Sequence, residues 1–194
     1  SPPPAARSPP ALSIPPPSIN NSRARSCVDY TRQPSSFFAS FTVNQPTAHS
    51  RVPVLLVGCG AVSRLFYLPS LRELARHGIL KTVAVVDPSA AARNALAGEL
   101  HAQPCATLAE GLAAGARLAI IATPPKFHRE QAEAAFAAGL DVLCEKPLAS
   151  SVADGEAMIA AAANSGRQLA AGHYKRFFPA HRAIKLLIER QTFG

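Results

Sequence analysis

Residues 52–63 read VPVLLVGCGAVS, an apolar run that ends in two closely spaced glycines. A continuously apolar run of this length is typical of a strand buried on both faces of a parallel sheet. Gly58 permits a tight turn, and Gly60 has no side chain to hold an anion away from the backbone. The amides and the dipole of a following helix would then favour that anion. The segment therefore predicts a strand, a phosphate-binding turn and a helix that starts at Ala61.

The third glycine-motif position holds Ser63, where Gly or Ala normally packs the helix against the strand. Glycines also mark ordinary strand-to-helix turns, so a turn without a ligand is the alternative. Asp87 ends the next apolar run, further from Gly58 than the usual ~20 residues. A carboxylate there accepts hydrogen bonds from the adenosine ribose and repels a 2′-phosphate, which favours NAD over NADP. The alternative for Asp87 is a turn carboxylate before Pro88.

Strand and helix patterns alternate along the rest of the chain. Apolar runs predict further strands at residues 82–86, 118–122, 141–144 and 168–171. Helical spacing and end signals predict helices at residues 61–76, 90–101, 107–114, 126–138, 151–164 and 179–190. We expect Pro69 to kink or interrupt the first helix, and Ser89 to cap the second. This alternation predicts an α/β fold, a Rossmann-type doubly wound parallel sheet with helices on both faces.

Residues with special chemistry follow five of the predicted strands. They are Gly58-Cys59-Gly60, Asp87, Thr123-Pro124, Glu145-Lys146-Pro147 and Gly172-His173. Ligands of open parallel sheets bind outside the carboxyl ends of the strands. The sequence therefore predicts one ligand site at that edge.

Glu145-Lys146-Pro147 stands directly after an apolar strand, where a buried Lys–Glu pair is costly unless it is used. A lysine in a cleft loses solvation, so its ammonium becomes able to exchange a proton with a substrate hydroxyl. The alternative is a salt bridge within the loop. Pro147 fixes the backbone, and we hypothesise a cis peptide bond before it.

Five motifs in this order resemble the Gfo/Idh/MocA oxidoreductases, the family of glucose-fructose oxidoreductase and inositol dehydrogenase. The motifs are VGCGAVSRLFYLPSL, VVDPS, ATPPKFH, CEKPLA and GHYKRFFPAHR. The resemblance implies an enzyme that moves hydride between NAD, with NADP possible, and a hydroxyl carbon of a sugar, polyol or related small molecule. It also implies a homo-oligomer.

The resemblance assigns a role to each matching position. The pyrophosphate would lie on Gly58, Gly60, Ala61, Val62 and Ser63, and the adenosine ribose on Asp87. The cofactor cleft would be lined by Thr123, Pro124 and His128, with Arg176 near the domain junction. Glu145 would contact the nicotinamide ribose, and Lys146 would face the substrate as the catalytic residue. A backbone-bonded helix start is the alternative for His128, and a solvated side chain is the alternative for Arg176.

Composition divides the chain. Residues 1–51 are rich in proline, serine and arginine and have no apolar period, so we expect a disordered leader. Residues 52–175 would form the dinucleotide-binding domain, and residues 176–194 a linker helix. The resemblance implies that an α+β substrate domain is missing after Gly194, which would leave this piece inactive by itself.

The chain has 20 Lys and Arg residues against 12 Asp and Glu, but no basic run with interleaved aromatics, so we expect no nucleic-acid partner. No apolar run approaches the ~20 residues of a membrane span. Four separated cysteines lack metal-ligand spacing and indicate buried thiols in a cytoplasmic protein. The alternative to an enzyme is a dinucleotide sensor or co-regulator of the same fold. Lys146 favours the enzyme, and the Glu-Lys-Pro motif disfavours a methyltransferase.

Overall fold

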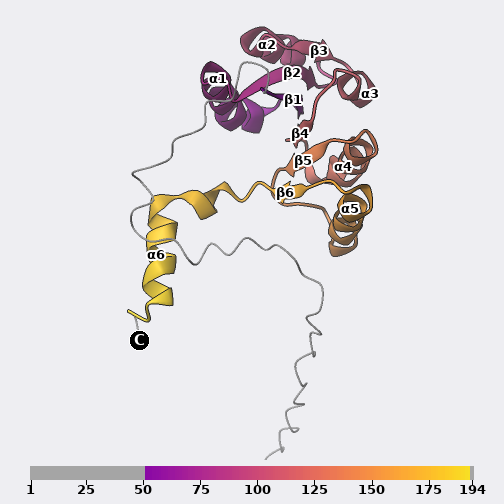
Figure 1. Ribbon diagram of the computed structural model, residues 1–194. Helices are drawn as coiled ribbons and strands as arrows, with labels where there is room; N and C mark the ends of the chain where they lie inside the picture. The colour runs from indigo at the N-terminus through magenta and orange to yellow at the C-terminus, as the bar shows by residue number, and fades with distance from the viewer. Residues whose placement is uncertain (1–50, 193–194) are drawn as a thin grey trace, which may run out of the picture. The chain divides into compact units, whose positions relative to one another are not determined.

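A six-stranded, all-parallel sheet forms the centre of the computed structural model, which describes residues 51–192. The strands succeed one another in the order β3-β2-β1-β4-β5-β6 (Figure 1). Their bounds are β1 Val52–Val57, β2 Leu80–Val86, β3 Gln103–Cys105, β4 Leu118–Ile121, β5 Asp141–Cys144 and β6 Leu169–Ala171. The strand order reverses beside β1, which is the switch point where ligands of such sheets bind. The predicted Rossmann-type fold is therefore confirmed, and the expected leader lies outside the described residues.

Helices connect the strands. They are η1 Ser63–Tyr67, α1 Leu68–Arg76, α2 Ala90–Leu100, α3 Leu108–Leu112, η2 Pro125–Phe127, α4 His128–Ala137, α5 Val152–Ser165, η3 Tyr174–Phe177 and α6 Pro179–Glu189. The cap expected at Ser89 is present, because its side chain accepts from the amide of Ala92. Ser151 caps α5 in the same way, and Gly166 ends that helix at φ 66°. Local chemistry therefore sets these helix ends.

Two hydrophobic clusters contain alternate residues of β1. Leu55 and Val57 lie in a cluster that includes Phe136 of α4 and Met158 of α5. Val54 and Leu56 lie in the other, with Leu71 of α1 and Leu96 of α2. All four strand side chains are buried, as the apolar run predicts. Helices therefore cover both faces of the sheet.

The sequence pattern missed the strand β3, the short helix η3 and the form of the first helical segment. β3 has the sequence QPC and pairs only with β2, at the edge of the sheet, where proline is tolerated. It is too short and too polar to show an apolar run. η1 is a π-helical turn that precedes α1, and Pro69 lies in the first turn of α1. The interruption expected at Pro69 is thus present as a change of helix type.

Candidate functional site

Gly58 makes the turn after β1 and lies hard against the end of β4. Its φ is +92°, and its amide donates to the carbonyl of Val86 over 2.8 Å. A Cβ atom at this position would lie 2.8 Å from the carbonyl oxygen of Ala122. The turn therefore needs glycine for two reasons, the positive φ and the close approach. Ser63, in the third motif position, is buried and donates from Oγ to the carbonyl of Gly58 over 2.6 Å.

Gly60 faces open space at the start of the helix. A Cβ atom there would have no neighbour within 4 Å, and the first helical bond runs from the amide of Arg64 to the carbonyl of Gly60. The amides of Ala61 and Val62 belong to the helix start, where no intrahelical acceptor exists. An open cradle beside free amides fits a pyrophosphate.

Asp87 accepts hydrogen bonds from the glycine turn and from the residue that caps α2. Its Oδ2 accepts from the amide of Cys59 and its Oδ1 from the amide of Ser89, each over 2.8 Å. Arg93 braces the same loop by donating from Nη1 to the carbonyl of Pro88 over 3.0 Å. Each carboxylate oxygen keeps a second lone pair, so Asp87 can stabilise the loop and still accept from a ribose hydroxyl. The turn and ligand interpretations of Asp87 are compatible.

Thr123 follows β4 beside the glycine turn. Its Oγ1 donates to Oε1 of Gln131 over 2.6 Å, and its Cγ2 would lie 3.0 Å from a Cβ atom on Gly58. The next residue, Pro124, is exposed. The structure thus places Thr123 and Pro124 at the strand-end edge together with the glycine turn.

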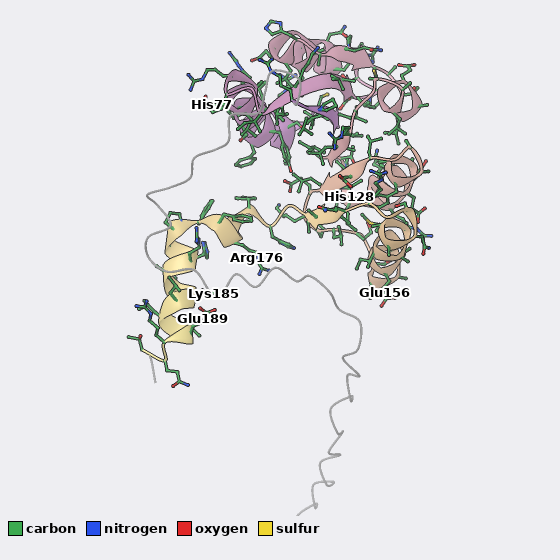
Figure 2. All side chains as sticks on the ribbon, in the orientation of Figure 1. His77, His128, Glu156, Arg176, Lys185 and Glu189 are labelled. Carbon is green, nitrogen blue, oxygen red and sulfur yellow. The ribbon has the colours of Figure 1, made fainter. Side chains whose placement is uncertain are left out.

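His128, labelled in Figure 2, is completely buried, and within residues 51–192 its ring nitrogens lie within hydrogen-bond distance of backbone carbonyls only. Its Nε2 lies 2.7 Å from the carbonyl oxygen of Thr123. Its Nδ1 lies 3.1 Å from that of Pro147 and 3.2 Å from that of Leu148. The side chain lies between the loop after β4 and the loop after β5, and its expected place in the cofactor cleft stays a prediction. These contacts match the backbone-bonded alternative weighed for His128.

Glu145 and Lys146 do not form the buried ion pair that the sequence suggested. Glu145 is 8% exposed, whereas Lys146 is exposed, and no ion pair joins them within residues 51–192. The carboxylate accepts instead from the backbone amide of Lys146 over 3.0 Å and from the hydroxyl of Tyr67 over 2.9 Å. The Lys146 side chain is exposed within residues 51–192, so the loss of solvation expected from the sequence is not present there, and its ammonium is free of Glu145. The peptide bond between Lys146 and Pro147 is cis, as hypothesised.

Tyr67 was not singled out from the sequence as a residue of the candidate site, whereas Gly172 was named among the strand-end residues. Burial, together with the hydrogen bond to the Glu145 carboxylate, raises the pKa of Tyr67 well above its usual value, so its hydroxyl stays a donor. A Cβ atom on Gly172 would lie 3.1 Å from Oε1 of Glu145. Two sequence signals lay near Tyr67: it belongs to the first quoted motif, and Pro69 indicated an irregular helix.

Arg176 lies apart from this constellation in the described contacts. It belongs to η3, and its side chain is exposed (Figure 2). Only its backbone amide has a partner in residues 51–192, the carbonyl of His173 at 3.0 Å. Its predicted contact with a cofactor stays a prediction.

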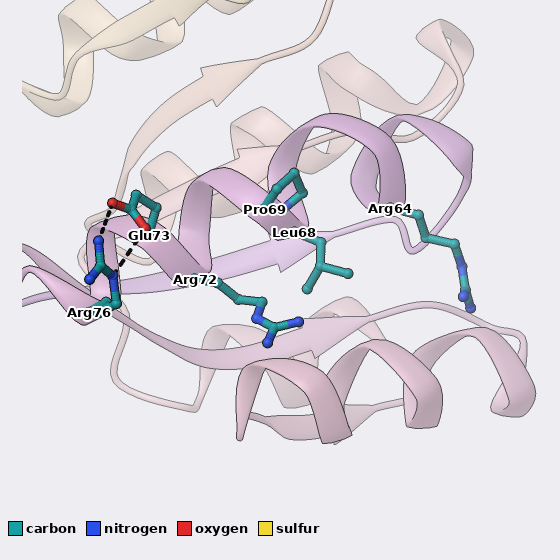
Figure 3. Close-up of a pocket in the computed structure, with 6 residues that line it drawn as sticks. All are labelled: Arg64, Leu68, Pro69, Arg72, Glu73 and Arg76. Atoms are coloured by element: carbon teal, nitrogen blue, oxygen red, sulfur yellow. Dashed lines mark hydrogen bonds and ion pairs between the residues drawn. The ribbon is translucent and has the colours of Figure 1, made fainter.

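A surface hollow on η1 and α1 is separate from the strand ends (Figure 3). It is lined by Arg64, Leu68, Pro69, Arg72, Glu73 and Arg76. Arg76 pairs with Glu73 over 2.7 Å and Arg72 pairs with Glu99 over 3.2 Å. None of the residues that follow a strand lines it, so this hollow is not the predicted site.

Within residues 51–192, no group of three or more His, Cys, Asp or Glu side chains could hold a metal ion. No helix in the same range is long and apolar enough to cross a bilayer. The three cysteines of this range are buried free thiols, as predicted, and Cys27 lies outside it.

The glycine cradle at the switch point and the acid after β2 define a dinucleotide-binding Rossmann domain. The profile of the Gfo/Idh/MocA family, described as an oxidoreductase family with an NAD-binding Rossmann fold, matches residues 52–173. The chain belongs to this family, as its motifs indicated.

Individual relatives are dehydrogenases and reductases. The chain is 33% identical over 121 residues to inositol 2-dehydrogenase 1 of Saccharopolyspora erythraea, covering 59% of this chain and 35% of that protein. It is 42% identical over 74 residues to 1,5-anhydro-D-fructose reductase of Ensifer adhaerens, covering 38% and 22%. The WlbA dehydrogenase of Bordetella pertussis, solved with NADH and UDP-GlcNAcA, is 30% identical with a TM-score of 0.68, covering 74% and 44%. The chain thus spans less than half of each relative.

Proposed function

We propose that this chain is the nucleotide-binding part of an NAD-dependent oxidoreductase that acts on a hydroxyl carbon of a sugar, polyol or related molecule. The observation that carries the proposal is the open space at Gly60. It is bordered by helix-start amides and by the Asp87 carboxylate, which accepts two backbone hydrogen bonds. Family membership supports the cofactor, and the sugar and polyol enzymes among the relatives support the substrate class.

Each part of the cofactor has candidate partners. The pyrophosphate would lie on the turn from Gly58 to Ser63, and the adenosine ribose hydroxyls would donate to Asp87. Glu145 would accept from the nicotinamide ribose. A carboxylate at position 87 opposes a 2′-phosphate, so NAD is preferred to NADP.

Bound nicotinamide supplies the hydride acceptor or donor. The substrate hydroxyl also exchanges a proton when its carbon loses or gains hydride. The neutral amine form of Lys146 would take that proton in the oxidation, and its ammonium form would return it in the reduction. Glu145 is bonded to Tyr67 and to the Lys146 amide, so it leaves the ammonium unpaired for the substrate. A dinucleotide sensor would have no need of an unpaired lysine at this edge, which favours the enzyme.

Titration calorimetry with NADH and NADPH tests the binding step on this chain. We expect the Kd of NADH to be roughly tenfold or more below that of NADPH, because the Asp87 carboxylate repels the 2′-phosphate of NADPH. No heat of binding at millimolar concentrations of either cofactor would reject the proposal.

The redox step needs the longest reading frame that contains this chain. Cofactor absorbance with a panel of polyols and nucleotide sugars tests it there. Binding of NADH without turnover of any member of the panel would favour the sensor.

A further inference from the structure

Tyr67 connects the first helical segment to the carboxylate at the end of β5. Its hydroxyl donates to Oε1 of Glu145 across 78 positions of the sequence. We propose that Tyr67 is a positioning residue, which fixes the Glu145 carboxylate so that it can accept from the nicotinamide ribose. This inference rests on the proposed function, because it assumes the ribose contact of Glu145.

The carboxylate of Glu145 is confined on three sides. Tyr67 bonds one oxygen and the amide of Lys146 bonds the other, over 2.9 and 3.0 Å. Gly172 closes the third side, since even a Cβ atom there would lie 3.1 Å from Oε1. Each oxygen has one donor within residues 51–192 and retains a lone pair for a ligand. Without the tyrosine hydroxyl, Oε1 loses that donor and the carboxylate is free to turn toward the Lys146 ammonium.

The π-helical turn explains how Tyr67 reaches the strand end. The amide of Leu68 donates to the carbonyl of Ser63, five residues back, which widens the helix at this point. Pro69 has no amide hydrogen and its ring crowds the carbonyl four residues before it, so a regular α-helix is disfavoured there. The widened turn places Tyr67 on Glu145, while the neighbouring Phe66 stacks on Tyr174 with ring centroids 5.8 Å apart.

The test compares two ligands on the same protein. ADP carries the adenosine and the phosphates only, whereas NADH also carries the nicotinamide ribose. For Tyr67→Phe we expect the Kd of NADH to rise roughly tenfold, because a hydrogen bond to a charged group is lost. The Kd of ADP should stay within about twofold, because the Gly58 turn and Asp87 are unchanged. Tyr174→Phe, whose hydroxyl has no partner within residues 51–192, is the matched control and should change neither.

A double-mutant cycle separates positioning from general stability. In a Glu145→Gln background, Tyr67→Phe should weaken NADH by less than about twofold more, because both changes remove one interaction. Additive losses would overturn the inference, as would equal losses of ADP and NADH affinity, or no loss of either. If the unmodified chain bound neither ligand, the proposed function would fail as well. Normal NADH binding by Tyr67→Phe would reject the positioning role alone.

Discussion

The amide of Cys59 donates a 2.8 Å hydrogen bond to Oδ2 of Asp87, which joins the glycine turn after β1 to the end of β2. The other oxygen of the same carboxylate accepts from the amide of Ser89. Two adjacent strand ends are thereby held in one arrangement before any ligand arrives.

Asp87→Asn should weaken NADH binding and reduce the preference for NADH over NADPH. An asparagine keeps one oxygen, but its NH₂ group faces an amide that needs an acceptor, and the repulsion of a 2′-phosphate is gone. We expect an NADH affinity about tenfold lower, measured by calorimetry. Asp141→Asn is the matched control, because Asp141 accepts from the amide of Gln168 at the other end of β5. Unchanged cofactor discrimination in Asp87→Asn would contradict the assignment.

Lys146→Met should abolish turnover and spare cofactor binding. The methionine keeps the apolar stem but removes the only group proposed to exchange the substrate proton. Loss of that proton transfer should lower the turnover rate roughly 100-fold or more. Steady-state rates with the panel of polyols in the longest reading frame, together with NADH calorimetry, measure the two effects. Lys81→Met, in the exposed part of β2, controls for loss of a positive charge. A parallel loss of NADH affinity would indicate that Lys146 is structural.

Gly111→Ala and Gly98→Ala should change stability in opposite directions. A Cβ atom on Gly111 of α3 would clash with Cγ2 of Val86 and lie 2.9 Å from Cδ1 of Leu55. Overpacking of this kind costs about 1–3 kcal/mol. Gly98 lies in the exposed part of α2 with no neighbour within 4 Å, so alanine there should add up to about 1 kcal/mol through helix propensity. Urea unfolding of both variants measures the difference, and a stabilised Gly111→Ala would show that α3 can shift away from the sheet.

The buried thiols should resist alkylation and make the fold sensitive to high pH. Burial, with a smaller contribution from Asp87, raises the pKa of Cys59 from 9.0 to about 12. Burial, and then Glu145, raises that of Cys144 to about 12 as well. Below pH 9 these thiols are protonated in both states; between pH 9 and 12 the unfolded chain ionises first, so their contribution to stability falls as pH rises.

Iodoacetamide labelling with peptide mapping tests the thiols directly. Below pH 9 we expect Cys59 and Cys144 to be modified only after unfolding, because the thiolate is the nucleophile. Rapid labelling of either residue in the folded chain would show that the strand ends open to solvent.

The sequence predicted those parts of the molecule in which neighbouring residues determine the structure. β1 was evident because its burial on both faces demands an unbroken apolar run. Ser89 was predicted as a cap because its hydroxyl stands directly before a helix and can accept from a free amide of the first turn. The strand β3 was not predicted, because its pairing with β2 and not its composition makes it a strand.

The sequence named the strand-end residues of the candidate site, but it did not show which distant segments contact them. Gly58 and Asp87 could be predicted because each directly follows an apolar run in the sequence. The hydrogen-bond partner of Glu145 could not be predicted from the sequence, because Tyr67 reaches it only through the packing of a π-helical turn. His128 belongs to a family motif, but its complete burial follows from two loops that fold over it.

The buried ring of His128 lies between the loop after β4 and the loop after β5. Its Nε2 lies 2.7 Å from the carbonyl oxygen of Thr123, and its Nδ1 lies 3.1 and 3.2 Å from those of Pro147 and Leu148. A neutral ring donates from only one of the two nitrogens, and the other makes a packing contact. The buried ring fills the space between the two loops, so neither loop can shift in the folded chain unless the imidazole moves with it.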